Sequence, residues 1–357
     1  MDYNSYRRKT KEIKVGGVII GGSSPISVQS MTNTATQDFE ATYRQVESLA
    51  SAGCDIVRIS VPDEESAGVF SYIKNRGISV PLVADIHFSH KIAVRSIEAG
   101  ADKVRINPGN IGGRDKVREV VAACLERDIP IRIGVNAGSL EADILEKHGA
   151  PTPEALVEST LSHISILEEL NYDNIVVSIK ASSTQSMISA NRLMSEKVNY
   201  PLHLGVTEAG AGERAVVKSS IGIGTLLSLG IGDTIRVSLT DAPEKEVMCA
   251  KNILSSLNLI RDRMDIVSCP TCSRTRINLI GILSDFERRA EEEGISSLPI
   301  KVAIMGCAVN GPGEAREADI GIAGGVGEAL LFKKGKTVRK ISEGSIVDEL
   351  IDEIKKM

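Results

Sequence analysis

The chain has 357 residues, of which 42% are hydrophobic and 25% charged, a composition typical of globular enzymes with a large core. Forty-two basic residues against 47 acidic ones give a net charge of −5, which argues against nonspecific binding to nucleic acids. Aromatic residues make up only 3% and Trp is absent, so neither base-stacking surfaces nor membrane aromatic belts are expected.

The first residues are charged and have no apolar stretch behind them, so no signal peptide is predicted. No run approaches the roughly 20 apolar residues of a membrane span. Six irregularly spaced cysteines do not resemble a secreted disulfide framework. We therefore expect a cytoplasmic protein. Residues 12–20 then predict a small hairpin that turns at Gly16-Gly17.

Strand-like and helix-like segments alternate after this hairpin. The predicted strands are 26–30, 55–61, 81–86, 103–107, 131–136, 174–180, 202–207 and 234–240. Eight strands with helical crossovers in about 250 residues predict a (β/α)8 TIM barrel as the N-terminal domain, residues 1–264. A doubly wound sheet is disfavoured because its Gly-x-Gly-x-x-Gly turn is missing after the first strand.

A second, smaller α/β domain is predicted for residues 265–357. It contains a Cys-x-x-Cys loop, a further cysteine loop and a final helix over 346–356. Its first helix is expected over 274–293. Its predicted strands are 300–305, 320–323, 330–332 and 337–340.

Polar residues gather toward the C-terminal ends of the predicted barrel strands. Because side chains alternate along a strand, residues two apart share a face. The residues selected by this rule are Arg58, Asp85, Arg105, Asn107, Arg132, Asn136, Lys180, His203, Thr207, Arg236 and Ser238. One arginine alone would be explained by snorkelling, but five cations on five strands predict a phosphate-binding mouth. The expected ligand is a strongly anionic small molecule, most simply a diphosphate.

Two carboxylates near this mouth are candidate catalytic residues. Asp85 ends the third predicted strand, and Glu208 begins a glycine-rich loop that can fold over a ligand. Either group could donate a proton or orient a reacting group. A carboxylate at a strand end can also serve only as an ion-pair partner of an arginine, and this alternative stays open for Asp85.

Three cysteines, Cys269, Cys272 and Cys307, lie in two short loops of the second domain. Three soft thiolates are one ligand short of a closed metal site, and an open position is where a metal does chemistry. The pattern lacks the features of c-type haem attachment, of a bacterial ferredoxin and of a zinc ribbon. The other cysteines, Cys54 and two in helical segments (Cys124 and Cys249), are expected to be buried structural thiols.

Seven short motifs together resemble the 4-hydroxy-3-methylbut-2-enyl diphosphate synthase family. They include Val-Ala-Asp-Ile-His-Phe (83–88), Val-Arg-Ile-Asn-Pro-Gly-Asn (104–110) and Gly-Cys-Ala-Val-Asn-Gly-Pro-Gly-Glu (306–314). The others are residues 24–34, 52–58, 204–210 and 268–272. The likeness extends from about residue 10 to 325 and is similar to the shorter, two-domain bacterial form.

The resemblance implies an iron–sulfur oxidoreductase of the methylerythritol phosphate route to isoprenoids. Such an enzyme opens the ring of methylerythritol 2,4-cyclodiphosphate with loss of water, using two electrons from ferredoxin or flavodoxin. The resemblance also implies a 4Fe–4S cluster on Cys269, Cys272, Cys307 and Glu314, and a substrate contact at Asn310. It further implies a homodimer in which the cluster domain of one chain closes the barrel mouth of the other.

Two other functions are compatible with the residues alone. One is a non-redox barrel synthase that acts on a phosphorylated substrate and holds structural zinc. The other is an iron–sulfur sensor without turnover. A radical-type enzyme is disfavoured because no Cys-x-x-x-Cys-x-x-Cys occurs.

Overall fold

The computed structural model describes residues 3–307, 313 and 315–357. The chain divides into two units, Met1–Leu259 and Ile260–Met357. No described helix has both the length and the apolar character that a membrane crossing requires.

Unit 1 is a parallel barrel whose eight strands follow the order β8-β7-β6-β5-β4-β3-β10-β9. A parallel bridge between Val177 and Leu202 joins the two ends of this sheet and so closes the ring. The strands are β3 (Ser27–Met31), β4 (Ile56–Ser60), β5 (Leu82–Asp85), β6 (Lys103–Ile106), β7 (Ile131–Asn136), β8 (Ile175–Lys180), β9 (His203–Leu204) and β10 (Thr234–Ile235). The predicted TIM barrel is confirmed.

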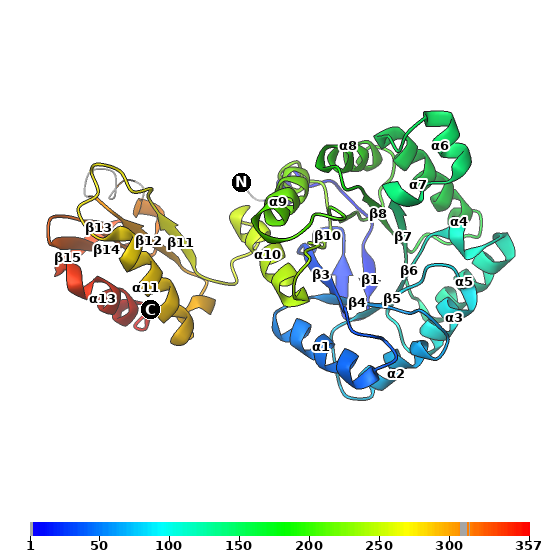
Figure 1. The fold of residues 1–357 in the computed structure, drawn as a ribbon, viewed down its shortest axis with the longest axis horizontal. Helices are drawn as coiled ribbons and strands as arrows, with labels where there is room; N and C mark the ends of the chain where they lie inside the picture. The colour runs from blue at the N-terminus through cyan, green and yellow to red at the C-terminus, as the bar shows by residue number, and fades with distance from the viewer. Residues whose placement is uncertain (1–2, 308–312, 314) are drawn as a thin grey trace. The chain divides into compact units, whose positions relative to one another are not determined.

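Helices form the outer layer around these strands (Figure 1). They begin at recognisable caps: the Asp38 and Ser89 side chains accept N–H bonds at the starts of α1 and α3, and Thr152 does so before Pro153 of α7. The helices are α1 (Phe39–Ser51), α2 (Val69–Lys74), α3 (His90–Glu98), α4 (Pro108–Ile111), α5 (Arg114–Arg127), α6 (Ala142–His148), α7 (Pro153–Glu168), α8 (Thr184–Ser195), α9 (Gly212–Ser228) and α10 (Pro243–Ser256).

The predicted N-terminal hairpin is formed by β1 (Ile13–Val15) and β2 (Val18–Ile20). Its buried residues Ile13, Val15 and Ile20 pack against the barrel residues Ile56, Val83 and Val176. These three lie toward the N-terminal ends of β4, β5 and β8. The hairpin therefore covers the end of the barrel that is opposite the strand C-termini.

The last two barrel strands are much shorter than predicted. Regular pairing covers two residues in β9 and two in β10, rather than 202–207 and 234–240. Both strands end early because the backbone groups that follow them hydrogen-bond to partners outside the sheet. Leu239 N–H donates to the Glu246 carboxylate, and Thr240 N–H donates to Gly210 O. The segments beyond β9 and β10 are consequently loops at the barrel mouth.

Unit 2 is a five-stranded sheet in the order β11-β12-β13-β14-β15. The first three strands run parallel to one another, and β14 and β15 are antiparallel to their neighbours. The strands are β11 (Asp265–Ser268), β12 (Lys301–Met305), β13 (Ile320–Gly324), β14 (Glu328–Lys333) and β15 (Lys336–Ser342), and the helices are α11 (Leu279–Glu292) and α13 (Ile346–Ile354).

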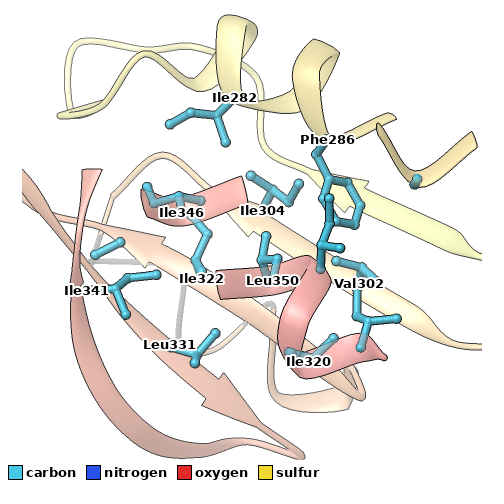
Figure 2. Packing of buried hydrophobic residues seen from close by; sticks show 14 of the residues in the cluster. Ile282, Phe286, Val302, Ile304, Ile320, Ile322, Leu331, Ile341, Ile346 and Leu350 are labelled. Atoms are coloured by element: carbon cyan, nitrogen blue, oxygen red, sulfur yellow. The ribbon is translucent and has the colours of Figure 1, made fainter. Parts of the chain in front are cut away.

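One apolar core joins α11 and α13 to the sheet of unit 2. Phe286 of α11 and Leu350 of α13 pack with Val302, Ile304 and other strand residues of alternating, inward-facing positions (Figure 2). Each fully buried side chain of this kind stabilises the fold by about 1.5–3 kcal/mol. This core fixes where β11 and β12 end, and the cysteine loops start there.

The first helix of unit 2 starts later than predicted, at Leu279 rather than near 274. Asn278 caps α11 by accepting the N–H of Gly281. Before this cap, Arg276 N–H donates to Gly306 O, so the residues are held against the neighbouring strand end instead of forming a helical turn. The segment after Cys269 is therefore a loop.

Candidate active site

The five predicted cations all lie on or just after barrel strands. Arg105 of β6 is in register with Arg132 of β7. Lys180, at the end of β8, is in register with the predicted site residue Asn136. The other two cations are Arg58 on β4 and Arg236 directly after β10. Side chains in register on parallel neighbours share a face, so the strands bring these groups together in the barrel.

Asp85 is the carboxylate that faces these cations most directly. Its Oδ1 lies 3.4 Å from a terminal nitrogen of Arg105, and its Oδ2 lies 3.8 Å from Nε of Arg58. The Nε2 of His87 lies 3.6 Å from the same Oδ2. Burial opposes ionisation of Asp85, but Arg58, Arg105 and Arg132 outweigh it and lower its pKa to about 2. Asp85 is therefore ionised at neutral pH.

Positive charge nevertheless exceeds negative charge in this part of the barrel. Arg132 is only 1% exposed, and burial together with repulsion from Arg58 and Arg105 holds its pKa well below the usual value. Burial and the nearby Arg236 and Arg58 likewise lower the pKa of Lys180. Cations that destabilise one another when buried are stabilised by an incoming anion. The mouth is thus suited to a ligand with several negative charges.

Two glycines provide the space that these long side chains occupy. A Cβ atom on Gly134 would lie 2.4 Å from Nε of Arg105. A Cβ atom on Gly205 would lie 2.5 Å from the carbonyl oxygen of Arg236 and 3.2 Å from Nζ of Lys180. Both glycines are recognisable in the sequence, because each lies two residues from a polar strand residue, in Arg132-x-Gly134-x-Asn136 and His203-x-Gly205-x-Thr207. Any side chain at either position would displace a cation.

Arg236 has a fixed partner that the sequence analysis missed. Its guanidinium lies 3.1 Å from the Glu246 carboxylate of α10. The same buried carboxylate accepts bonds from the Ser30 hydroxyl at 2.9 Å and from Leu239 N–H at 3.0 Å. No local pattern distinguishes Glu246 from the other charged residues of α10, because its role depends on how that helix packs against β3.

A second buried group lies deeper in the barrel. Lys103 is fully buried at the start of β6, and within the described chain its Nζ has no hydrogen-bond partner. Burial and repulsion from Arg132 hold the pKa of Lys103 well below its usual value. The predicted residue His203 is also fully buried, with Nδ1 3.4 Å from the Thr234 hydroxyl, and burial and Arg132 hold its pKa low as well. Lys103 was missed because it precedes the polar strand end.

The remaining predicted residues lie at the C-terminal end of β7 or in the loops that follow other strands. Asn107 is buried, and its side-chain oxygen accepts the N–H of Gly109 at 3.1 Å. Glu208 is exposed and has a φ of +53°, a conformation that costs a non-glycine residue about 1–2 kcal/mol. The half-buried residues of this group are Asn136, Thr207 and Ser238.

The cysteine loops of unit 2 follow the adjacent parallel strands β11 and β12. Gly306 N–H donates to Sγ of Cys269 at 3.2 Å, so the first loop lies against the residue that precedes Cys307. The backbone N–H and the side chain of Arg274 lower the pKa of Cys272. The lowered pKa favours the thiolate form of Cys272. Among the described residues, however, no three Cys, His, Asp or Glu side chains are close enough to hold a metal ion.

Glu314 and Asn310 lie outside the described residues. The donor set can therefore be judged only on the three cysteines, whose soft thiol groups come from two loops in contact with each other. Such a set suits iron–sulfur or zinc binding. The other cysteines differ clearly: burial raises the pKa of Cys54 and Cys124 to about 12 and also raises that of Cys249. These three are thiols.

The fold defines a class: a TIM-barrel protein with an appended α/β domain that presents cysteine loops. Comparison with known sequences gives the family. Residues 10–251 match the GcpE TIM-barrel domain and residues 265–356 match the GcpE protein C-terminal domain. The chain belongs to the GcpE family.

Two curated relatives illustrate the similarity. The chain is 56% identical over 351 residues to 4-hydroxy-3-methylbut-2-en-1-yl diphosphate synthase (flavodoxin) of Ruminiclostridium cellulolyticum, covering 98% of each chain. It is 54% identical over 345 residues to the protein of that name from Clostridium perfringens, covering 97% of this chain and 98% of the relative. The family resemblance read from the motifs is confirmed.

Among solved structures, Yersinia pestis dihydropteroate synthase shares the barrel, with a TM-score of 0.50 and 13% identity over 69% of this chain and 98% of that chain. The type I 3-dehydroquinate dehydratase of Clostridium difficile has the same TM-score and identity, over 70% and 98%. At this identity the likeness concerns the fold alone.

Proposed function

We propose that this chain catalyses formation of 4-hydroxy-3-methylbut-2-enyl diphosphate from methylerythritol 2,4-cyclodiphosphate. Two electrons and two protons enter, a carbon–oxygen bond of the ring breaks, and one oxygen leaves as water. The observation that carries the proposal is the group of five cations on five barrel strands, opposed by the carboxylates of Asp85 and Glu246. Such a surplus of buried positive charge matches a diphosphate better than a singly charged ligand.

The site residues have four proposed roles. Arg58, Arg105, Arg132, Lys180 and Arg236 neutralise the diphosphate, while Asn107, Asn136, His203, Thr207 and Ser238 are candidates for positioning it. Asp85 is ionised, so it orients Arg58 and Arg105 rather than donating a proton. Glu208 is the candidate for handling protons, since its strained backbone at a loop start favours a functional carboxylate over local stability.

A 4Fe–4S cluster is the cofactor that this reaction needs. Cys269, Cys272 and Cys307 would hold it together with Glu314, and Asn310 in the same loop is a candidate substrate contact. When bound, the cluster supplies the electrons for ring opening. The support from this chain is the contact between the two cysteine loops and the lowered pKa of Cys272.

Flavodoxin is the proposed electron donor, because the names of the relatives specify it. We also infer a cytoplasmic homodimer. The support for self-association is a row of exposed apolar side chains on α9, namely Val216, Val217 and Ile221, next to exposed Met248 on α10. A monomer gains nothing from such a face.

Anaerobically purified protein tests the function. We expect a brown protein with broad absorption near 400 nm that converts the cyclodiphosphate to the open diphosphate when reduced flavodoxin is supplied. Colourless zinc protein would favour the non-redox synthase, and a brown protein without turnover would favour the sensor. Arg132→Met should weaken substrate binding without changing the absorption, whereas the exposed Arg118→Met is the matched control.

Cysteine variants test the cofactor separately. Cys272→Ser and Cys307→Ser should lose most of the iron, because a serine hydroxyl is a poor ligand for it. Cys249→Ser should keep its iron, since this thiol lies in unit 1 and its pKa is raised by burial. Iron content by chemical assay decides the matter. A Cys307→Ser protein with full iron would contradict the assignment.

A further inference from the structure

Glu141 is held by two residues of one helix. It lies directly before α6, in the loop that follows β7. Its Oε1 is 2.6 Å from Nε2 of His163, and its Oε2 accepts the Ser159 hydroxyl at 2.8 Å. Ser159 and His163 are four residues apart on α7, and both are buried. This spacing places both groups on the same side of the helix, where they hold the two carboxylate oxygens.

Gly109 packs directly on this group. A Cβ atom at position 109 would lie 2.8 Å from Cε1 of His163 and 3.2 Å from Oε1 of Glu141. The approach is therefore so close that only glycine fits. Gly109 N–H also donates to the Asn107 side-chain oxygen. This bond occupies the amide oxygen of Asn107. The two N–H donors of the same amide are then free to bind an anion.

We propose that Glu141, His163 and Ser159 form a positioning group for substrate binding, acting through Gly109 on Asn107. The group joins two loops at the barrel mouth, because Asn107 and Gly109 follow β6 whereas Glu141 belongs to the segment that follows Asn136 of β7. None of its three members touches the substrate. The inference rests on the proposed function only in that Asn107 must contact the diphosphate.

The packing of α7 does not itself require this polar group. Leu156, Ile164 and Leu167 already bury the helix against the barrel. Burial lowers the pKa of His163 although Glu141 raises it, which favours a neutral imidazole. A neutral ring contacts the carboxylate without adding to the positive charge of the mouth.

Substitution of His163 provides the test, in the full-length enzyme with its cluster. His163→Phe keeps a ring but removes the nitrogen that contacts Glu141, and should raise KM for the cyclodiphosphate about tenfold with kcat within twofold. His163→Gln keeps an N–H within reach of Glu141 and should restore KM to within about threefold of wild type. Iron content should be the same in both. Ser159→Ala, which perturbs the fold less, should raise KM about threefold.

A double-mutant cycle separates positioning from a structural role. If His163 acts through Asn107, the pair His163→Phe and Asn107→Ala should raise KM no more than Asn107→Ala alone, because residues acting through one contact are not additive. Thr160→Val is the matched control: this buried hydroxyl bonds only within α7, to Leu156 O, so its loss should lower Tm without changing KM.

Each remaining outcome overturns the inference. If Asn107→Ala raises KM and His163→Phe does not, or if the two effects add in full, His163 is structural and the proposed function stands. If Asn107→Ala leaves KM unchanged while the enzyme still converts the cyclodiphosphate, the predicted binding pocket is wrong. The proposed positioning group is then wrong as well. If wild-type protein does not turn over the cyclodiphosphate at all, the proposed function itself is wrong.

Discussion

Asp85 shows how one buried carboxylate can organise several cations. Its two oxygens contact Arg58 and Arg105 separately, so it fixes two side chains that would otherwise repel each other. Because its pKa is about 2, this organisation is complete at neutral pH and needs no ligand. A site arranged in this way binds an anion without first reordering its side chains, which lowers the entropic cost of binding.

This lowered pKa predicts a pH dependence of stability. A carboxyl whose pKa falls from 3.8 to about 2 on folding adds about 2.5 kcal/mol above pH 4, which is lost as the pH falls toward 2. Asp85→Asn lacks this contribution at every pH. The difference in unfolding free energy between wild type and variant, measured with urea, should therefore shrink between pH 5 and pH 3. A constant difference would show that Asp85 is not ionised by its neighbours.

Lys103 predicts a rise of stability with pH in the alkaline range as well. The folded state holds it with a lowered pKa, so the unfolded chain binds one more proton between that pKa and about 10.4. Wild-type stability should rise with pH across this window by up to about 1.4 kcal/mol per unit relative to Lys103→Met. The variant should be the more stable protein at pH 7 and lose this advantage by pH 10. Urea midpoints at four pH values would measure it.

At the level of elements, α10 supports the barrel mouth from outside. Its Glu246 reaches β3 through Ser30, the residue after β10 through Arg236, and the following loop through Leu239. Regular sheet pairing of β10 ends after two residues, and the hydrogen bonds of the Glu246 side chain hold the chain beyond that point. The loop that carries Ser238 owes its position to this helix.

Glu246→Gln should therefore affect binding more than chemistry. The amide keeps the shape but weakens the charge-assisted bond to Arg236, which is worth about 1.5–3 kcal/mol. We expect KM for the cyclodiphosphate to rise three- to tenfold and Tm to fall by a few degrees, with iron content unchanged. Glu244→Gln on the same helix, which bonds the Ser48 hydroxyl at 2.8 Å, is the control. Equal effects of both variants on KM would rule out a specific role for Glu246.

The elements also explain what the sequence could predict. Strand periodicity is a local property, so it located the barrel strands and placed Arg58, Arg105, Arg132 and Lys180 on their inner faces. Glu246 and His163 contact partners that lie on other elements or loops, and no local pattern reveals such contacts. The late start of α11 has the same origin, because the bond from Arg276 to Gly306 competes with helix formation.

On the scale of the whole molecule, the predicted site residues are divided between the two units. Unit 1 carries the cations, and unit 2 carries the cysteine loops, each on its own core. Neither unit contains both the group of five cations and the cysteine loops. If the proposed homodimer forms an active site from the barrel of one chain and the cluster of the other, defects in different units should complement.

Mixed dimers test this arrangement. Glu208→Gln and Cys307→Ser chains should each be inactive, and random reassortment should give about one half mixed dimers. Each mixed dimer would have one intact site of two, so about a quarter of wild-type activity is the upper limit. Activity measured after co-expression, with dimer composition checked by differently tagged chains, provides the readout. No recovery in proven mixed dimers would mean that each chain works alone.

The hairpin of β1 and β2 has a consequence for the order of events during turnover. Ile13, Val15 and Ile20 cover one end of the barrel. Substrate and product must therefore both pass through the opening at the other end. A new substrate molecule therefore cannot enter behind a departing product. Product should compete directly with substrate, and its release becomes a step that every cycle must complete before the next one begins.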